Sequence, residues 1–137
     1  MKFDWTQYLN VAEEFIEHSQ SSTFREAYLR SAISRSYYCA FCLARNFLKE
    51  RGTVFPEDKI NIHEFVIKTY SESGDRTEEK VGENLKRLRN DRVEADYFEI
   101  MHVTEVIAKL DFDTAKRTVN KIEEMKIKEK KEGKQIF

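Results

Sequence analysis

The chain has 137 residues, of which 40% are hydrophobic and 36% charged, with 24 Lys and Arg against 25 Asp and Glu. This length suits one domain with its own core, and the near-neutral balance excludes a uniformly basic nucleic-acid coat protein. Four Gly and one Pro are too few for the many turns of an all-β domain, while ten Phe and six Tyr argue against a disordered chain. The composition predicts a soluble, mostly helical domain.

The N-terminal segment and the two cysteines indicate a cytoplasmic protein. Residues 1–9 lack the apolar core of a secretory signal, and the longest apolar run, Tyr37–Ala44, is far too short to span a membrane. Cys39 and Cys42 fall in the middle of a predicted helix and have no second pair of Cys or His ligands, so we interpret them as buried core residues. We expect no metal, cofactor or membrane contact.

Apolar residues at helical spacing predict five helices joined by short loops. Capping-box patterns at Asp4–Gln7 and Thr23–Glu26 mark the first two helix starts. In chain order the sequence predicts a helix from residue 4 that ends within 18–22, one over 24–51, one over 58–72, one that starts at 75 or 77, and a last one that includes 103–122. Such helices pack most simply as an up-and-down bundle.

The C-terminal segment is dominated by charge. Lys126–Lys134 reads KIKEKKEGK, and we expect it to fray. The sequence shows no repeat and no linker that would divide the rest of the chain. The predicted organisation is therefore one helical domain over residues 1–125 and a charged tail over residues 126–137.

The longest predicted helix is central and carries an uneven charge. Its second half, Tyr37–Leu48, is apolar on most faces, which is typical of a buried helix. Residues 24–51 contain six basic and two acidic side chains, whereas residues 1–20 contain one basic and four acidic ones. A positive region beside Tyr37 and Tyr38 suits RNA, through phosphate contacts and base stacking. The alternative, which is more common, is a solvated polar face with both tyrosines in the core.

An arginine interrupts the apolar stripe of the fourth predicted helix. Arg92 follows Leu88 by four residues and precedes Ala95 by three, so it falls on the buried face. A buried guanidinium needs a partner, and Asp96, four residues later, is the nearest one along the helix. With Arg89 close by, the cluster could hold phosphate oxygens. Equally, an Arg92–Asp96 pair could only fix the packing of this helix.

Hydroxyl and histidine side chains supply further candidates. Ser34 and Tyr38 lie one turn apart, and their hydroxyls could meet the arginines of the fourth helix if the two helices are neighbours. The three histidines are widely separated and form no metal-ligand pattern. Of these, His63 begins an amphipathic stretch and could face a cleft, but we expect a surface or capping role.

Two sequence blocks together resemble a known superfamily. RSAISRSYYCAFCLARNFL (residues 30–48) and LKRLRNDRVEADY (residues 85–97) are similar to the HEPN superfamily, most closely to its small stand-alone prokaryotic proteins. The resemblance extends over about residues 3–125. It implies an all-α bundle of four to five helices that pairs into a symmetric homodimer. Many HEPN domains are metal-independent endoribonucleases of toxin–antitoxin or phage-defence pairs, with a small nucleotidyltransferase as partner.

The family's catalytic signature is incomplete in this chain. It consists of an Arg followed by a polar residue, and then a His that is separated from the Arg by four to six residues. Arg89 and Asn90 match the first half, but the His positions hold Glu94, Ala95 and Asp96. Either Glu94 or Asp96 replaces the His as a general acid or base, or the site binds without cleaving. A carboxylate paired with an arginine is a poor proton donor at neutral pH, which favours binding without efficient cleavage.

The resemblance and the residue pattern lead to one functional hypothesis and one alternative. The hypothesis is a HEPN protein that binds RNA or a nucleotide and acts as an endoribonuclease-type effector, with the fourth helix near the two-fold axis of a homodimer. The alternative is a non-catalytic interaction or dimerisation module that partners a nucleotidyltransferase. The candidate catalytic residues are Arg89, Asn90, Glu94 and Asp96, and the candidate RNA- or nucleotide-binding residues are Arg89, Arg92, Tyr97, Ser34 and Tyr38.

Overall fold

A computed structural model describes residues 2–57 and 61–136. The described residues form five α-helices and no strand, so the predicted all-α fold is confirmed. The helices are α1 (Gln7–Ser19), α2 (Arg25–Glu50), α3 (Ile62–Ser71), α4 (Arg76–Tyr97) and α5 (Thr104–Ile136). None of the described helices combines the length and the apolar character that a membrane crossing requires.

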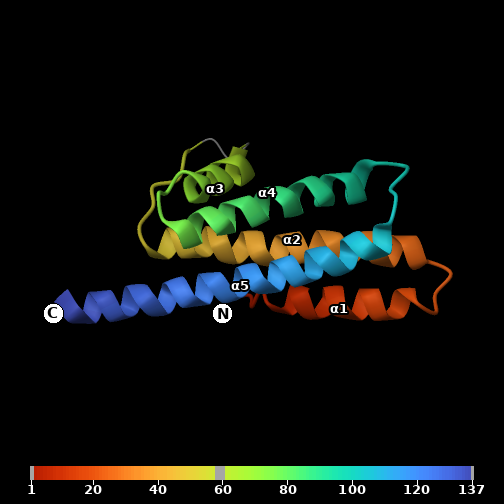
Figure 1. Ribbon diagram of the computed structural model, residues 1–137, viewed down its shortest axis with the longest axis horizontal. Helices are drawn as coiled ribbons and strands as arrows, with labels where there is room; N and C mark the ends of the chain where they lie inside the picture. The colour runs from red at the N-terminus through yellow and green to blue at the C-terminus, as the bar shows by residue number, and fades with distance from the viewer. Residues whose placement is uncertain (1, 58–60, 137) are drawn as a thin grey trace.

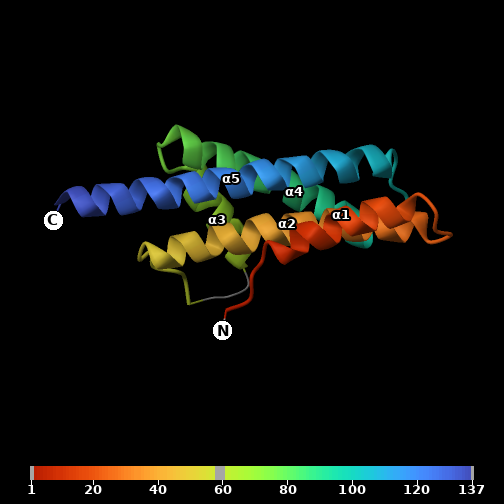
Figure 2. The ribbon, with the colours of Figure 1, turned by 90° about the horizontal axis from the view of Figure 1, so that it is seen from below.

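The four longer helices run up and down beside one another, as Figures 1 and 2 show. Helix α2 is the central element, because it contacts each of the other four helices. The short helix α3 lies against α4 and has little contact with α2. This arrangement is the predicted bundle, and it brings the first turn of α3, the middle of α2 and the C-terminal half of α4 together.

The core is built around α2, as its apolar sequence predicts. Tyr37, Phe41, Ala44 and Phe47 of α2 are buried in one cluster with apolar side chains of α3, α4 and α5. Cys39 and Cys42 are buried free thiols, and burial raises the pKa of the Cys39 thiol to about 12. A thiol that stays protonated is a poor nucleophile and metal ligand, so both cysteines act as small apolar core residues.

The helix starts differ from the two predicted capping boxes. Asp4 accepts hydrogen bonds from the backbone N–H and the hydroxyl of Thr6, at 3.0 and 2.6 Å, and α1 starts only afterwards, at Gln7. Thr23 does not cap α2, because Ser22 Oγ accepts the N–H of Phe24 at 2.9 Å instead. In both cases a short polar side chain forms a local turn two residues ahead, which competes with the cap. The predicted start of the third helix at residue 58 lies outside the described residues.

Helix α5 continues through the segment that we expected to fray. It extends to Ile136 and therefore includes most of the predicted charged tail. Lys126 pairs with Glu123 at 3.7 Å, and Glu129 lies 3.8 Å from Arg51, beyond the end of α2. Opposite charges at helical spacing support a helix even where it buries little surface.

Candidate functional site

Arg92 is the side chain around which the candidate site is built. Its side chain is 12% exposed, and its Nη1 lies 3.4 Å from Asp96 Oδ2, which is the predicted i, i+4 pair. The guanidinium also lies over two rings of α2, 5.6 Å from the Tyr37 centroid and 5.4 Å from that of Tyr38. Arg92 Nε is buried and has no hydrogen-bond partner in the described part of the chain. A guanidinium held by aromatic faces and one carboxylate keeps donor capacity for a further anion.

His63 enters the same site from the first turn of α3. Its Nδ1 lies 2.6 Å from the Tyr37 hydroxyl, and its ring stacks on Phe41 with centroids 4.2 Å apart. Burial lowers the pKa of His63 to about 4, and the positive charges of Arg89, Arg92 and Arg45 add to this effect. The imidazole is therefore neutral at pH 7. The expected surface or capping role of His63 is wrong, because α3 turns this ring towards α2.

A hollow of about 450 Å³ opens beside His63, and we call it the His63 hollow. Two arginines of α2 stack on its aromatic rings: Arg35 lies 4.6 Å from the Tyr8 centroid and Arg45 lies 5.7 Å from that of Trp5. Its walls come from the N-terminal segment and from α1, α2 and α3, namely Trp5, Tyr8, Arg35, Tyr38, Phe41, Cys42, Arg45, Ile62 and His63.

A second hollow, of about 480 Å³, adjoins the first and shares Tyr8 and Arg35 with it. Ser34 of α2 and Asp96 of α4 both line this second hollow, so the two helices are neighbours, as the sequence reasoning required. Ser34 is buried, but the described residues show no hydrogen bond from its hydroxyl to an arginine. Asp96 thus pairs with Arg92 and also borders the second hollow.

The charges around these hollows do not balance. Four arginines contribute: Arg35 and Arg45 line the hollows, and Arg89 and Arg92 lie near enough for their charges to lower the pKa of His63. In the described ranges, the ion pair of Arg92 with Asp96 is the only contact within 4 Å between these four side chains and a carboxylate. The site therefore presents excess positive charge next to aromatic rings. No group of three or more His, Cys, Asp and Glu side chains suited to a metal ion occurs among the residues described.

The structure separates the predicted site residues into two groups. Tyr38, Ser34 and Asp96 line the two hollows, Arg92 pairs with Asp96, and Arg89 acts on His63 through its charge. The other three lie outside them: Asn90 is on the exposed face of α4, Glu94 is half-buried without a described ion pair, and Tyr97, at the end of α4, is 74% exposed.

Sequence reasoning missed several members of the site. His63, Trp5, Tyr8, Arg35 and Arg45 were not among the candidate residues, although all of them line the His63 hollow. One signal pointed to Arg35 and Arg45. Each comes directly after a buried residue of α2, yet neither has an acidic residue three or four positions away in the sequence.

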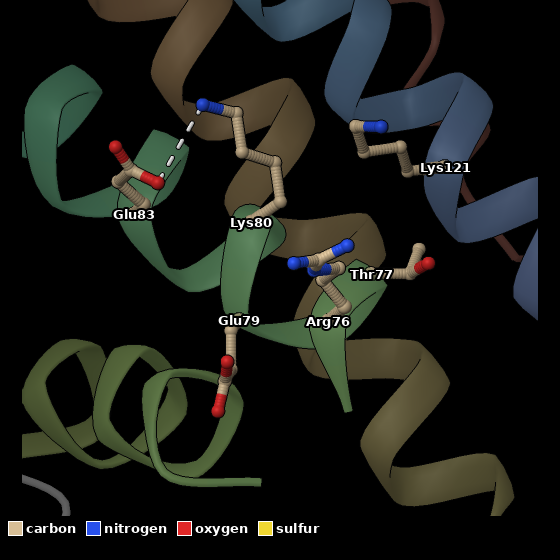
Figure 3. Close-up of a pocket in the computed structure, with 6 residues that line it drawn as sticks. All are labelled: Arg76, Thr77, Glu79, Lys80, Glu83 and Lys121. Carbon is tan, nitrogen blue, oxygen red and sulfur yellow. Dashed lines mark hydrogen bonds and ion pairs between the residues drawn. The ribbon is translucent and has the colours of Figure 1, made fainter. Parts of the chain in front are cut away.

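Another hollow, shown in Figure 3, lies between the start of α4 and α5. It is lined by Arg76, Thr77, Glu79, Lys80, Glu83 and Lys121, with an ion pair of 3.5 Å between Lys80 and Glu83. These side chains comprise three basic and two acidic ones and no aromatic ring. This mixed, largely exposed surface offers no wall for stacking and little excess charge, so we do not regard it as the functional site.

The comparisons with known proteins agree with the fold. Residues 5–131 match the family described as HEPN domain, which is nearly the whole chain. No curated protein and no solved structure gave a match to this chain. The match covers all five helices except the last turns of α5, and it includes both hollows. This chain belongs to the HEPN domain family.

Proposed function

We propose that this HEPN domain binds single-stranded RNA at the His63 hollow and its neighbour. The observation that carries the proposal is the set of four arginines that has, among the described residues, a single carboxylate partner and lies beside half-buried aromatic side chains. Guanidinium groups match phosphate oxygens in charge and in geometry. Tyr and Trp rings offer faces on which unpaired bases stack. Stacking requires splayed bases, so the site favours single strands over duplex RNA.

The two adjoining hollows suit an extended ligand better than one mononucleotide. Each has the volume of a small-ligand site, and Arg35 and Tyr8 form a shared wall between them. A nucleotide in each hollow would place the connecting phosphate near Arg35. We therefore expect oligonucleotides to bind more tightly than the corresponding mononucleotides.

A binding titration tests this proposal. Affinity for a labelled single-stranded RNA is measured against salt concentration for the wild type and for Arg89→Ala/Arg92→Ala. Loss of two guanidinium contacts should weaken binding roughly 100-fold and flatten the salt dependence. The matched control is Arg76→Ala/Lys80→Ala, which removes two positive charges from the hollow of Figure 3. Equal losses in both variants would mean non-specific charge attraction and would overturn the proposal.

Cleavage of the bound RNA is the second candidate function, and it fits an endoribonuclease-type effector in toxin–antitoxin or phage-defence pairs. Asp96 favours it, because this carboxylate borders the second hollow beside Arg92. A carboxylate next to a bound ribose could accept the 2′-hydroxyl proton. Incubation of a defined RNA in EDTA, with Asp96→Asn and Glu94→Gln as comparisons, decides the question. Cleavage products that form in EDTA with the wild type but not with Asp96→Asn would support cleavage. If the RNA stays intact, the protein binds RNA without cleaving it.

A protein-interaction role is the alternative, and the connection between α4 and α5 favours it. Six large apolar side chains there and in the first turns of α5 are 45–74% exposed: Tyr97, Phe98, Ile100, Val103, Val106 and Leu110. Val103 also has a φ of 49°, a strained backbone for a β-branched residue. Apolar surface gathered in this way marks protein contact sites.

We propose that a second copy of the chain covers this surface, which would place the C-terminal end of α4 in the interface of a homodimer. Sedimentation of the wild type and of Ile100→Asp/Val103→Asp measures this directly. A dimer that the double variant converts to a monomer supports the proposal. A wild type that is monomeric until a nucleotidyltransferase-type protein is added would instead assign the surface to that partner.

A further inference from the structure

The hydrogen bond between Tyr37 and His63 determines where the imidazole carries its proton. Tyr37 is fully buried, and His63 Nδ1 is the one hydrogen-bond partner of its hydroxyl within the described ranges. A phenol has one O–H to donate, and a buried O–H without an acceptor is costly. The hydroxyl is best satisfied when it donates to Nδ1, which then acts as the acceptor.

This leaves the other ring nitrogen, Nε2, as the protonated one. Burial raises the pKa of Tyr37 far above its usual value, so the phenol keeps its proton at neutral pH. A neutral imidazole whose Nδ1 accepts must carry its hydrogen on Nε2. Stacking on Phe41, at 4.2 Å and 19° between the planes, fixes the orientation of the ring. Nε2 has no hydrogen-bond partner among the described residues, and His63 forms part of the wall of the His63 hollow.

The surrounding charges oppose a second proton on this ring. Tyr37 and Tyr38 of α2 contact His63, and the charges of Arg45, Arg89 and Arg92 act on it. Tyr8, Arg35 and Cys42 are the other ionisable residues that line the hollow. None of these groups is a carboxylate. The protein thus holds a neutral N–H donor close to several arginines.

We propose that Tyr37 locks His63 as the Nε2–H tautomer and that this neutral N–H donates a hydrogen bond to a phosphate oxygen held by Arg89 and Arg92. The inference rests on the proposed function, because it assigns a role to His63 in the same site. His63 in this state is a positioning donor and not a proton acceptor, since its free nitrogen already carries hydrogen. Any proton acceptor for cleavage must therefore come from another side chain, such as Asp96.

A neutral donor differs from a further cation in what it selects. The arginines attract any anion, whereas an N–H group fixed in direction distinguishes a phosphate oxygen at one position from others nearby. Because the ring does not gain charge between pH 6 and 8, its contribution to binding stays constant over that range.

Nuclear magnetic resonance spectra of the histidine ring nitrogens test the tautomer in the free protein. Two-bond ¹H–¹⁵N correlations at pH 7 should show His63 protonated on Nε2 and unprotonated on Nδ1, and Tyr37→Phe should abolish this preference. His18 and His102 give internal comparisons in the same spectrum. A protonated Nδ1, or a doubly protonated ring, would overturn the inference whatever the protein binds.

Ligand binding tests the donor role separately. Added pyrophosphate, and then a short single-stranded RNA, should shift the Nε2 signal of His63 more than the Nδ1 signal. His63→Phe, which keeps a ring that can stack on Phe41, should weaken RNA binding about tenfold, and His63→Gln, which restores a neutral N–H, should recover part of the loss. Tyr37→Phe should show an intermediate loss with an unchanged fold by circular dichroism.

The two proposals fail in different ways. If RNA binds and depends on Arg89 and Arg92 but His63→Phe binds as tightly as the wild type, the donor role is wrong and the proposed function stands. If RNA does not bind while pyrophosphate still shifts Nε2, the donor role stands and the macromolecular ligand is wrong. If neither ligand shifts Nε2, the donor role is overturned.

Discussion

Arginines near the ends of α2 and arginines along its middle differ in whether a carboxylate pairs with them. Near the ends, Arg25, Arg30 and Arg51 each reach a carboxylate, at 2.5, 2.9 and 2.5 Å. In the middle, Arg35 and Arg45 stack on aromatic rings and have no described carboxylate partner. Paired arginines have their charge offset within the fold, whereas arginines held by aromatic faces keep their charge and donors available. One helix therefore carries both structural and ligand-binding arginines, and their partners distinguish them.

The largest expected effect on stability is at Arg30. Its guanidinium donates to the backbone oxygens of Ala95, Phe98 and Glu99, so it acts as a cap on the C-terminal end of α4. Arg30→Ala should lower the free energy of unfolding by about 2 kcal/mol, because these oxygens lose a charged donor. Urea denaturation measures this change. The affinity of the folded variant for RNA should stay at the wild-type value. If the variant also lost RNA affinity, the distinction between structural and ligand-binding arginines would be wrong.

Glu26→Gln separates the two contacts of Arg30. Glu26 Oε2 accepts from Arg30 Nε at 2.9 Å and from the Thr104 hydroxyl at 2.9 Å. The variant weakens the ion pair but leaves the bonds from Arg30 to the backbone oxygens intact. It should therefore lose much less stability than Arg30→Ala.

Arg35→Ala is the matching change in the middle of α2. It removes a guanidinium that both hollows share, so RNA binding should weaken about tenfold. Stability should change by less than about 0.5 kcal/mol, because no ion pair is lost and the side chain is half-exposed. Fluorescence anisotropy with labelled RNA measures the affinity, and urea denaturation of the same sample measures the free energy of unfolding. A large loss of stability with unchanged affinity would place Arg35 among the structural arginines.

The sequence predicted the arginine of α4 and missed the histidine of α3 for a physical reason. Arg92 stood out because a charge on an apolar stripe, with Asp96 four residues later, is visible within one helix. His63 lies 26 residues from Tyr37, and what brings the two side chains to 2.6 Å is the packing of α3 at the middle of the bundle. Helix periodicity describes which face is buried but not which residue of another helix it meets. The all-α bundle was therefore predictable, and half of the site was not.

A buried acid on α5 extends the comparison to a carboxylate, because none of the described ion pairs includes it. Asp111 is fully buried and neither of its oxygens has a described hydrogen-bond partner. Burial, together with the neighbouring carboxyl of Asp91, raises the pKa of Asp111 to about 9. The carboxyl is thus neutral at pH 7 in the folded protein and ionised in the unfolded chain.

This difference makes stability depend on pH. The folded state binds a proton that the unfolded state has lost above pH 4, so the contribution of Asp111 is fully present below pH 4 and declines as the pH rises towards 9. Asp111→Asn, which is neutral at every pH, should raise the melting temperature at pH 8 by about 3–5 °C and change it little at pH 4. A variant whose gain is the same at both pH values would show that Asp111 is not protonated in the fold.

The smallest expected effect is at the Arg25–Glu105 pair, although its distance of 2.5 Å is among the shortest in the molecule. The two side chains are 43% and 31% exposed, so water screens their attraction and solvates either one when the other is removed. Glu105 also accepts from Gln20 and pairs with Lys109 at 3.3 Å, which leaves it partnered after Arg25→Gln. We expect the melting temperature of that variant to change by about 1 °C or less. Distance alone therefore does not identify the structural arginines: Arg30 donates to three backbone oxygens at the end of α4, whereas Arg25 donates to one, that of Ser19 at 3.5 Å.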